Sequence, residues 1–134
     1  MEAALVRFVR RRAAHRCEYC QLPQVVCQLP HEIDHIIAQK HRGATSSENL
    51  ALACVACNNY KSCNIAGIDP MSGQVLRLFN PRRDRWKRHF RWDGPILAGR
   101  TAIGRTTIIV LEINLPERVL RRQALIQEGV FPPH

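Results

Sequence analysis

The sequence predicts an α+β fold, organised as a single domain over residues 1–134. The length is typical of one domain, because domains cluster near ~100–150 residues. Apolar and polar residues alternate over 31–37 and again at the start of 49–57, which predicts two short strands. A helix is expected to start within 57–62, so these segments would form a ββα unit. With 46% hydrophobic and 23% charged residues, the chain is typical of a globular protein and not of a disordered or fibrous one.

The charge balance narrows the class of partner. Lys and Arg number 20 against 11 Asp and Glu, which gives a formal net charge of +9 and a pI of about 10.0. Such a surplus on a small protein favours a polyanion such as a nucleic acid. The longest apolar run, 50–57, has eight residues, whereas a membrane span needs about 20, so no membrane partner is expected. Arginines interrupt the apolar N-terminal stretch, so we expect no secretory signal and a cytoplasmic location.

Four of the six cysteines form two CxxC pairs, Cys17 with Cys20 and Cys54 with Cys57. Two such knuckles can supply four thiolates to one tetrahedral Zn²⁺ ion, and in a reducing compartment metal binding is commoner than disulfide formation. We therefore expect a structural zinc site that staples the ββα unit. A redox CxxC and four ordinary buried cysteines are the alternatives. Cys27 and Cys63 lie outside the pattern and are expected to be reduced, partly buried thiols.

Three segments complete the N-terminal half of the chain. Residues 3–16 predict a short basic helix whose apolar anchors are Leu5, Val6, Phe8 and Val9. Two prolines within 21–30 predict a loop, and the polar run 40–49, which carries a glycine, predicts another.

Residues 64–134 predict a basic α/β extension. Turns are expected at 69–73 and 93–95, and a short strand at 75–79. Residues 101–113 contain a β-branched run that suits either a helix or a strand.

The last predicted element is a helix over 115–128. Asn114 is its expected cap, Pro116 lies in its first turn and Gly129 would end it. The expected buried stripe of this helix comprises Leu115, Val119, Leu120 and Ile126.

A constellation of polar residues lies between and beside the two cysteine pairs: Asp34-His35-Ile36, Asn49-Leu50 and Cys57-Asn58-x-x-Lys61. This pattern resembles the HNH endonucleases, also called ββα-metal nucleases, over residues 17–63. The CxxC pairs resemble those of the zinc-bearing subgroup. Segments 65–70, 80–82 and 89–92 look like the extension of small stand-alone bacterial HNH proteins. The resemblance implies an N-terminal basic helix over 1–16, an HNH core over 17–63 and the extension over 64–134.

The resemblance also implies roles for four residues. His35 would be the general base, since an imidazole titrates near working pH. Asp34 and Asn58 would bind the catalytic ion, and Asn49 would hold the loop that orients His35. Asn58 stands where the family name implies histidine. A carboxylate and an amide oxygen are hard ligands, which suit Mg²⁺ or Mn²⁺ better than Zn²⁺.

Basic residues near this pattern are candidate nucleic-acid contacts. Arg42 precedes Gly43 in a loop where similar sequences often carry a second glycine, and Lys61 belongs to the motif itself. Segment 82–92 interleaves arginines and lysines with three aromatic residues, which suits phosphate and base contacts. We expect the aromatic side chains to point inward and the basic ones outward; a purely solvated face is the alternative. The basic candidates of this segment are Arg82, Arg83, Arg85, Lys87 and Arg88.

Two functions from different classes fit these residues. The first is a metal-dependent endonuclease that nicks or cuts DNA, with RNA left open as a substrate. The second is a zinc-stabilised nucleic-acid-binding module without catalysis, which would not need Asp34, His35 and Asn58 together. Sequence specificity and oligomeric state are not written in the sequence.

Overall fold

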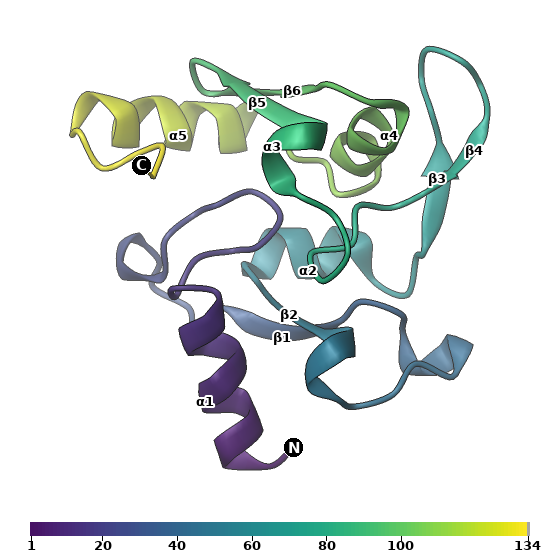
Figure 1. The fold of residues 1–134 in the computed structure, drawn as a ribbon. Helices are drawn as coiled ribbons and strands as arrows, with labels where there is room; N and C mark the ends of the chain where they lie inside the picture. Colours follow the sequence, from purple (N-terminus) through teal and green to yellow (C-terminus); the bar gives the residue numbers. More distant parts are fainter. Residues whose placement is uncertain (134) are drawn as a thin grey trace.

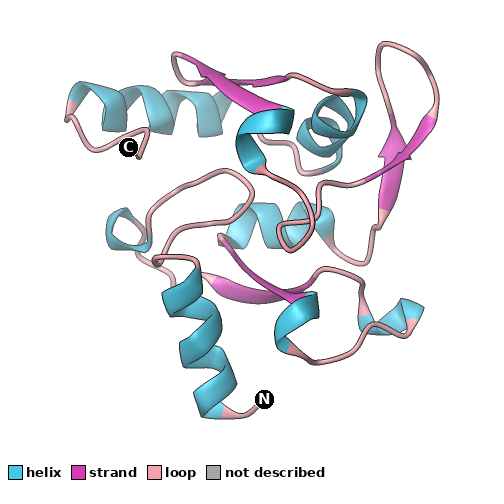
Figure 2. Ribbon diagram, in the orientation of Figure 1, coloured by secondary structure: helices cyan, strands magenta, loops and turns pink. Residues whose placement is uncertain are grey.

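The computed structural model describes residues 1–133, which adopt an α+β fold (Figure 1; Figure 2). The helices are α1 (Ala3–Arg12), α2 (Val55–Lys61), α3 (Trp86–His89), α4 (Ala102–Val110) and α5 (Pro116–Gln127). The strands are β1 (Glu32–His35), β2 (Leu50–Ala53), β3 (Ala66–Ile68), β4 (Val75–Arg77), β5 (Phe90–Asp93) and β6 (Ile96–Gly99). Short 3₁₀ turns are η1 (Gln24–Val26), η2 (Gln39–His41) and η3 (Ser47–Asn49).

Within residues 1–133 the strands pair into three two-stranded antiparallel sheets, β1–β2, β3–β4 and β5–β6. A lone two-stranded sheet is at best marginally stable in water. The stability of each hairpin therefore depends on the helices and side chains packed against it.

The predicted ββα unit is present as β1, β2 and α2. In its register Asp34 lies opposite Ala51, and His35 lies opposite Leu50. Every residue of β2 is buried, because successive side chains enter different clusters. Leu50 and Leu52 pack against Val9 of α1, while alternate residues of the strand enter the central core.

The first cysteine knuckle covers the second edge of β2. The Glu18 backbone N–H donates to Leu52 O at 2.8 Å, and the Leu52 N–H donates to the Glu18 carboxylate at 2.8 Å. The backbone groups of Leu52 are thereby paired, as a buried strand edge requires.

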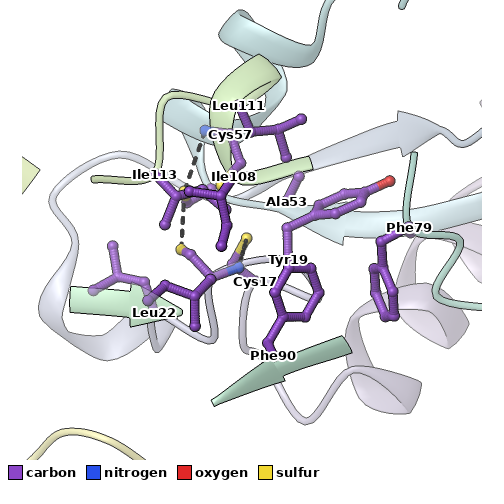
Figure 3. Close-up of a cluster of buried hydrophobic side chains, with 14 of the residues drawn as sticks. Cys17, Tyr19, Leu22, Ala53, Cys57, Phe79, Phe90, Ile108, Leu111 and Ile113 are labelled. Atoms are coloured by element: carbon purple, nitrogen blue, oxygen red, sulfur yellow. Dashed lines mark hydrogen bonds between the residues drawn. The ribbon is translucent and has the colours of Figure 1, made fainter. Parts of the chain in front are cut away.

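The central core joins the ββα unit to the C-terminal extension. In Figure 3 Tyr19 and Ala53 from the first part lie beside Phe79, Phe90 and side chains of the α4 region. The rings of Phe79 and Phe90 meet edge to face with centroids 5.1 Å apart, a favourable arrangement for aromatic pairs.

The aromatic residues of segment 82–92 point inward, as the sequence predicts. Trp86 Nε1 donates to the backbone oxygen of Tyr19 at 2.8 Å, and Trp92 Nε1 donates to the Gln21 side chain at 2.8 Å. Phe90 is buried. The indole groups therefore attach the extension to the first cysteine knuckle.

The turns at 69–73 and 93–95 and the strand within 75–79 are confirmed. Residues 102–110 within the ambiguous run are helical, with the Thr101 hydroxyl accepting from Gly104 N at 3.0 Å as a cap. Strands β3, β5 and β6 and the short helix α3 are not in the prediction, since each has only three or four residues.

Some helix details in the sequence prediction are wrong. Helix α1 ends at Arg12, and its Phe8 is 44% exposed instead of anchored in the core. Leu120 of α5 is 70% exposed, whereas Arg122 and Leu125 form the buried face of that helix. The helix is therefore turned about its own axis relative to the prediction. Arg122 points inward and donates to the backbone oxygens of Pro95 and Ile113.

Asn114 does not cap α5, whose N-cap is Leu115. Instead its side-chain amide pairs with Leu97 of β6, accepting from Leu97 N at 2.9 Å and donating to Leu97 O at 2.8 Å. Pro116 opens the helix as expected. From the sequence, Asn114 is predicted to cap the helix that follows it, because the local pattern contains no information on the distant strand β6.

No helix within residues 1–133 combines the length and the apolar character that a membrane crossing requires.

Asp69 provides a first prediction. Its carboxylate is buried and accepts a bidentate pair from Arg105 at 3.0 Å and 3.0 Å and the Ser72 hydroxyl at 2.7 Å. The Arg105 bonds lower the pKa of Asp69, so its stabilisation is present above the unfolded-state pKa of about 3.9 and is lost as pH falls below it. Asp69→Asn should lower the melting temperature at pH 7, and the deficit should shrink below about pH 4.

Thermal unfolding of wild type and variant between pH 2 and pH 8 tests this. Asp93→Asn is the control, because Asp93 is exposed and forms no ion pair within residues 1–133. A deficit that is independent of pH would show that the ionised Asp69 carboxylate is not what stabilises the β3–β4 turn.

Candidate active site and metal centre

The two cysteine pairs converge on one point. Their sulfur atoms lie within 4.8 Å of one another, and all four residues are buried: Cys17, Cys20, Cys54 and Cys57. Cys20 Sγ and Cys54 Sγ, one from each pair, are 3.7 Å apart. Zn–S bonds of about 2.3 Å in a tetrahedron place sulfur atoms roughly 3.8 Å apart. The geometry of the four sulfurs therefore fits a zinc ion.

Backbone geometry supports the same assignment. The N–H of Cys20 points at Cys17 Sγ and that of Cys57 at Cys54 Sγ, each at 3.4 Å. Burial raises the pKa of Cys17 and Cys57, whereas hydrogen bonds from the other three cysteines lower the pKa of Cys20. Four buried thiols ionise together only when a cation compensates them, which zinc does. Cys27 and Cys63 are partly buried free thiols.

Arg118 of α5 reaches the cysteine cluster from far along the chain. Its Nη2 donates to Cys57 Sγ at 3.0 Å and lies 3.9 Å from Cys54 Sγ. Burial would lower the pKa of Arg118, but the neighbouring sulfur charges outweigh it and raise that pKa. Four thiolates with one Zn²⁺ carry a net charge of about −2, so a guanidinium here offsets part of it. Sequence reasoning did not identify Arg118, since only the fold brings α5 here.

Asp34 lies in β1 with its side chain turned toward α2. It is 4% exposed and accepts from the Tyr19 hydroxyl at 2.6 Å and from Lys61 Nζ at 3.1 Å. Burial raises the pKa of Asp34, while Lys61 and Tyr19 act in the opposite direction. Ile33, the neighbour on the opposite face of β1, packs toward α1.

Lys61 is not a surface contact, which corrects the expectation that it binds nucleic acid. Its side chain is 1% exposed, and its ammonium makes three bonds of 3.1 Å, to Asp34 Oδ1, His35 O and Ile36 O. An ammonium has three N–H donors, so none is left for a phosphate. Lys61 instead ties the end of α2 to the end of β1, where Asp34 and His35 lie.

His35 is partly exposed at the end of β1. Its Nε2 lies 2.9 Å from Thr45 Oγ1 in the following loop. Because neighbouring strand residues point to opposite faces, the His35 ring and the Asp34 carboxylate leave β1 on different sides.

Asn49 closes the loop that follows His35. Its Oδ1 accepts from Ile37 N at 2.9 Å, and its Nδ2 donates to Ile37 O at 2.9 Å and to Ala44 O at 2.8 Å. Gly43 is required here, because a Cβ at that position would lie 1.7 Å from Ile37 O. The preceding Arg42 has a left-handed backbone with φ of 69°, a conformation that glycine adopts without strain.

Asn58 lies in α2 one turn before Lys61. Its Nδ2 donates to Glu32 Oε1 at 2.9 Å, so the amide oxygen faces away from that bond. An amide oxygen and a carboxylate are the hard donors that Mg²⁺ and Mn²⁺ select. The donor set thus fits a divalent ion in kind, and any such ion would share the Asp34 carboxylate with Lys61.

The predicted basic contacts divide into two groups. Arg82 is paired with Glu18 and its side chain is only 14% exposed, so its guanidinium is engaged within the protein. Arg42 and the remaining basic candidates of segment 82–92 are exposed: Arg83, Arg85, Lys87 and Arg88. Among the described residues, no hydrogen bond joins the exposed side chains of 83–88 to His35 or its loop.

Tyr19 and Thr45 are two further residues of the site that the sequence interpretation did not identify. Tyr19 sits inside the first CxxC pair, where an apolar core role is the default, and its hydroxyl is seen to serve Asp34 only in the fold. Thr45 is one of several small polar residues in a loop, and no pattern distinguishes it from its neighbours.

Comparison with known proteins agrees with this geometry. Residues 17–63 match the family model described as HNH endonuclease. The matched segment contains both cysteine pairs, β1, β2 and α2. Residues 17–63 are therefore an HNH endonuclease domain that contains both CxxC pairs, and such a domain suggests nuclease activity in general. Searches of curated proteins and of solved structures find no match for the chain.

The cysteine cluster leads to a prediction about metal content. Wild-type protein should bind one zinc ion per chain, and Cys20→Ser should lose the zinc together with cooperative unfolding. The reason is that a structural zinc ion contributes on the order of 10–16 kcal/mol of apparent binding free energy. Elemental analysis and thermal melts measure both. Cys63→Ser is the control and should retain zinc; a zinc-free Cys20→Ser with wild-type melting temperature would contradict a structural role.

The buried ion pair between Lys61 and Asp34 leads to a prediction about stability. Lys61→Met should lower the free energy of unfolding by about 3–5 kcal/mol, because it leaves the Asp34 carboxylate buried without its cation. The double variant Asp34→Asn/Lys61→Met should recover much of that loss. Denaturant unfolding measures both.

The exposed Arg42 provides the matched control for Lys61. Arg42→Met should leave stability within about 0.5 kcal/mol, while its effect on DNA affinity is measured by gel shift. If Lys61→Met instead weakened DNA binding at unchanged stability, Lys61 would be a nucleic-acid contact after all.

Proposed function

We propose that this protein is a metal-dependent endonuclease that hydrolyses DNA phosphodiester bonds. The observation that carries the proposal is the arrangement of His35, Asp34 and Asn58 within the HNH segment. Asp34 and His35 are adjacent in β1, which Lys61 fixes to the helix that bears Asn58. Asn49 fixes the loop beside His35.

His35 suits the role of general base. A neutral imidazole accepts a proton near physiological pH, and a positioned base contributes about 10²–10⁴-fold to the rate. The ring is partly exposed at a strand end, where water and a phosphate can approach. In the step we propose, His35 takes a proton from water as the water oxygen bonds to phosphorus. The P–O3′ bond breaks, and the 3′ oxygen takes a proton from solvent, which leaves a 5′ phosphate.

Asp34 and Asn58 are the residues that would hold Mg²⁺ or Mn²⁺. When bound, such an ion stabilises the charge that builds on the phosphate and on the leaving oxygen. Lys61 opposes the rise that burial causes in the pKa of Asp34, and its ammonium holds the carboxylate toward α2. Tyr19 holds the other carboxylate oxygen by its hydroxyl.

The charge of the protein supports DNA as the partner. A formal net charge of +9 attracts a polyanion. Arg42 adjoins the His35 loop, and Arg83, Arg85, Lys87 and Arg88 provide exposed positive charge on the extension. A reducing compartment such as the cytoplasm would keep the four zinc cysteines as thiols.

Plasmid cleavage tests the proposal. Supercoiled DNA incubated with the protein should become nicked or linear with Mg²⁺ or Mn²⁺ and stay intact in EDTA. His35→Ala should reduce the rate by about 10²-fold or more, since it removes the base. Its zinc content and melting temperature should match those of wild type.

His41→Gln is the matched control for His35→Ala. His41 is an exposed histidine of the same loop, its ring bonds only to Cys63 O at 3.1 Å, and glutamine keeps a donor there. Equal cleavage by wild type and His35→Ala would remove His35 from the role of base. Intact DNA with a salt-sensitive gel shift would favour the non-catalytic binding module, and cleavage of RNA alone would change the substrate.

A further inference from the structure

The imidazole of His35 is held by a side chain to which the HNH pattern assigns no role. His35 Nε2 lies 2.9 Å from Thr45 Oγ1. Gln39 Nε2 donates to the same hydroxyl at 3.3 Å. Asn49 pins the backbone of Ala44, the residue before Thr45, at 2.8 Å. The hydroxyl is thus held against His35 by a loop that is itself fixed beside it.

Counting protons and lone pairs limits what this hydroxyl can do. A threonine hydroxyl has one hydrogen and two acceptor lone pairs, and a neutral imidazole carries one N–H. Gln39 uses one lone pair of Thr45 Oγ1, and the second is open to an N–H at Nε2 of His35. When Nε2 carries the hydrogen, the lone pair at Nδ1 is free. A general base needs that free lone pair, and the partner of one ring nitrogen decides the state of the other.

We propose that Thr45 is a positioning residue that selects the catalytic tautomer of His35. Its Oγ1 accepts from Nε2–H, which holds the ring in place and leaves Nδ1 as the atom that receives the proton of water. The inference rests on the proposed endonuclease activity, and it adds which nitrogen acts and what fixes it. The opposite arrangement, in which Thr45 donates to Nε2, would place the hydrogen on Nδ1 and deprive that nitrogen of its lone pair.

Nitrogen NMR reads the tautomer directly and without activity. Two-bond ¹H–¹⁵N correlation spectra of histidine-labelled protein, with the His35 signals assigned by their loss in His35→Ala, should show Nε2–H in wild type. Thr45→Ser keeps the acceptor and should keep this pattern. Thr45→Val removes the acceptor at nearly constant shape and should give an average of both tautomers. An Nδ1–H pattern for His35 in wild type would overturn the proposal.

Kinetics provide the second measurement. Thr45→Val should lower kcat by about tenfold, because the His35 ring is no longer held in place and part of its population also has the wrong tautomer, while KM for DNA stays within about twofold. Thr45→Ser should restore kcat to within about threefold of wild type. Unchanged kcat in Thr45→Val would overturn the positioning role.

Ser46→Ala is the matched control, since it removes the neighbouring hydroxyl, which caps no turn. It should leave both kcat and the His35 spectrum unchanged. Thr45 is exposed, so zinc content and melting temperature of Thr45→Val should equal those of wild type. Failure of the proposed endonuclease function has a different result, which is the absence of cleavage by the wild type with Mg²⁺ and with Mn²⁺. The spectra would then still show which atom donates in the His35–Thr45 bond.

Discussion

The buried four-cysteine cluster joins distant parts of this protein at a single point. Its sulfurs come from the first knuckle and from the junction of β2 with α2, and Arg118 brings α5 to the same point. Each of the three sheets within residues 1–133 has only two strands. A two-stranded sheet is at best marginally stable by itself. A tetrahedral zinc ion would fix the knuckle beside β2 and give the small core a rigid centre.

The geometry of the proposed catalytic site depends on a second, buried interaction. The Lys61 ammonium forms an ion pair with Asp34 and donates hydrogen bonds to the backbone oxygens of His35 and Ile36. An ion pair with so little exposure stabilises only when its donors are satisfied, as they are here. Its consequence is positional: the strand end with Asp34 and His35 cannot shift relative to the helix that bears Asn58. Stability and site geometry are therefore coupled through one side chain.

The extension supports the HNH segment by packing as well as by charge. Trp86 and Trp92 donate to the backbone and side chain of the first knuckle, and Arg82 pairs with Glu18 of that knuckle. A segment that reads as a nucleic-acid surface thus also holds the zinc knuckle in place. The exposed basic side chains of this segment are accessible to a polyanion: Arg83, Arg85, Lys87 and Arg88.

Residue types and their short spacing are enough to predict the local features of this protein. The CxxC pairs predict the metal cluster, the alternation around Asp34 and Leu50 predicts β1 and β2, and the HNH pattern points to His35. The directions of the long side chains follow from the fold alone, because contacts between distant segments leave no local signal in the sequence. Lys61 turns inward to a strand 27 residues earlier. Arg118 donates to the sulfur of a cysteine 61 residues earlier. Thr45 meets His35 because the loop fixed by Asn49 returns to it.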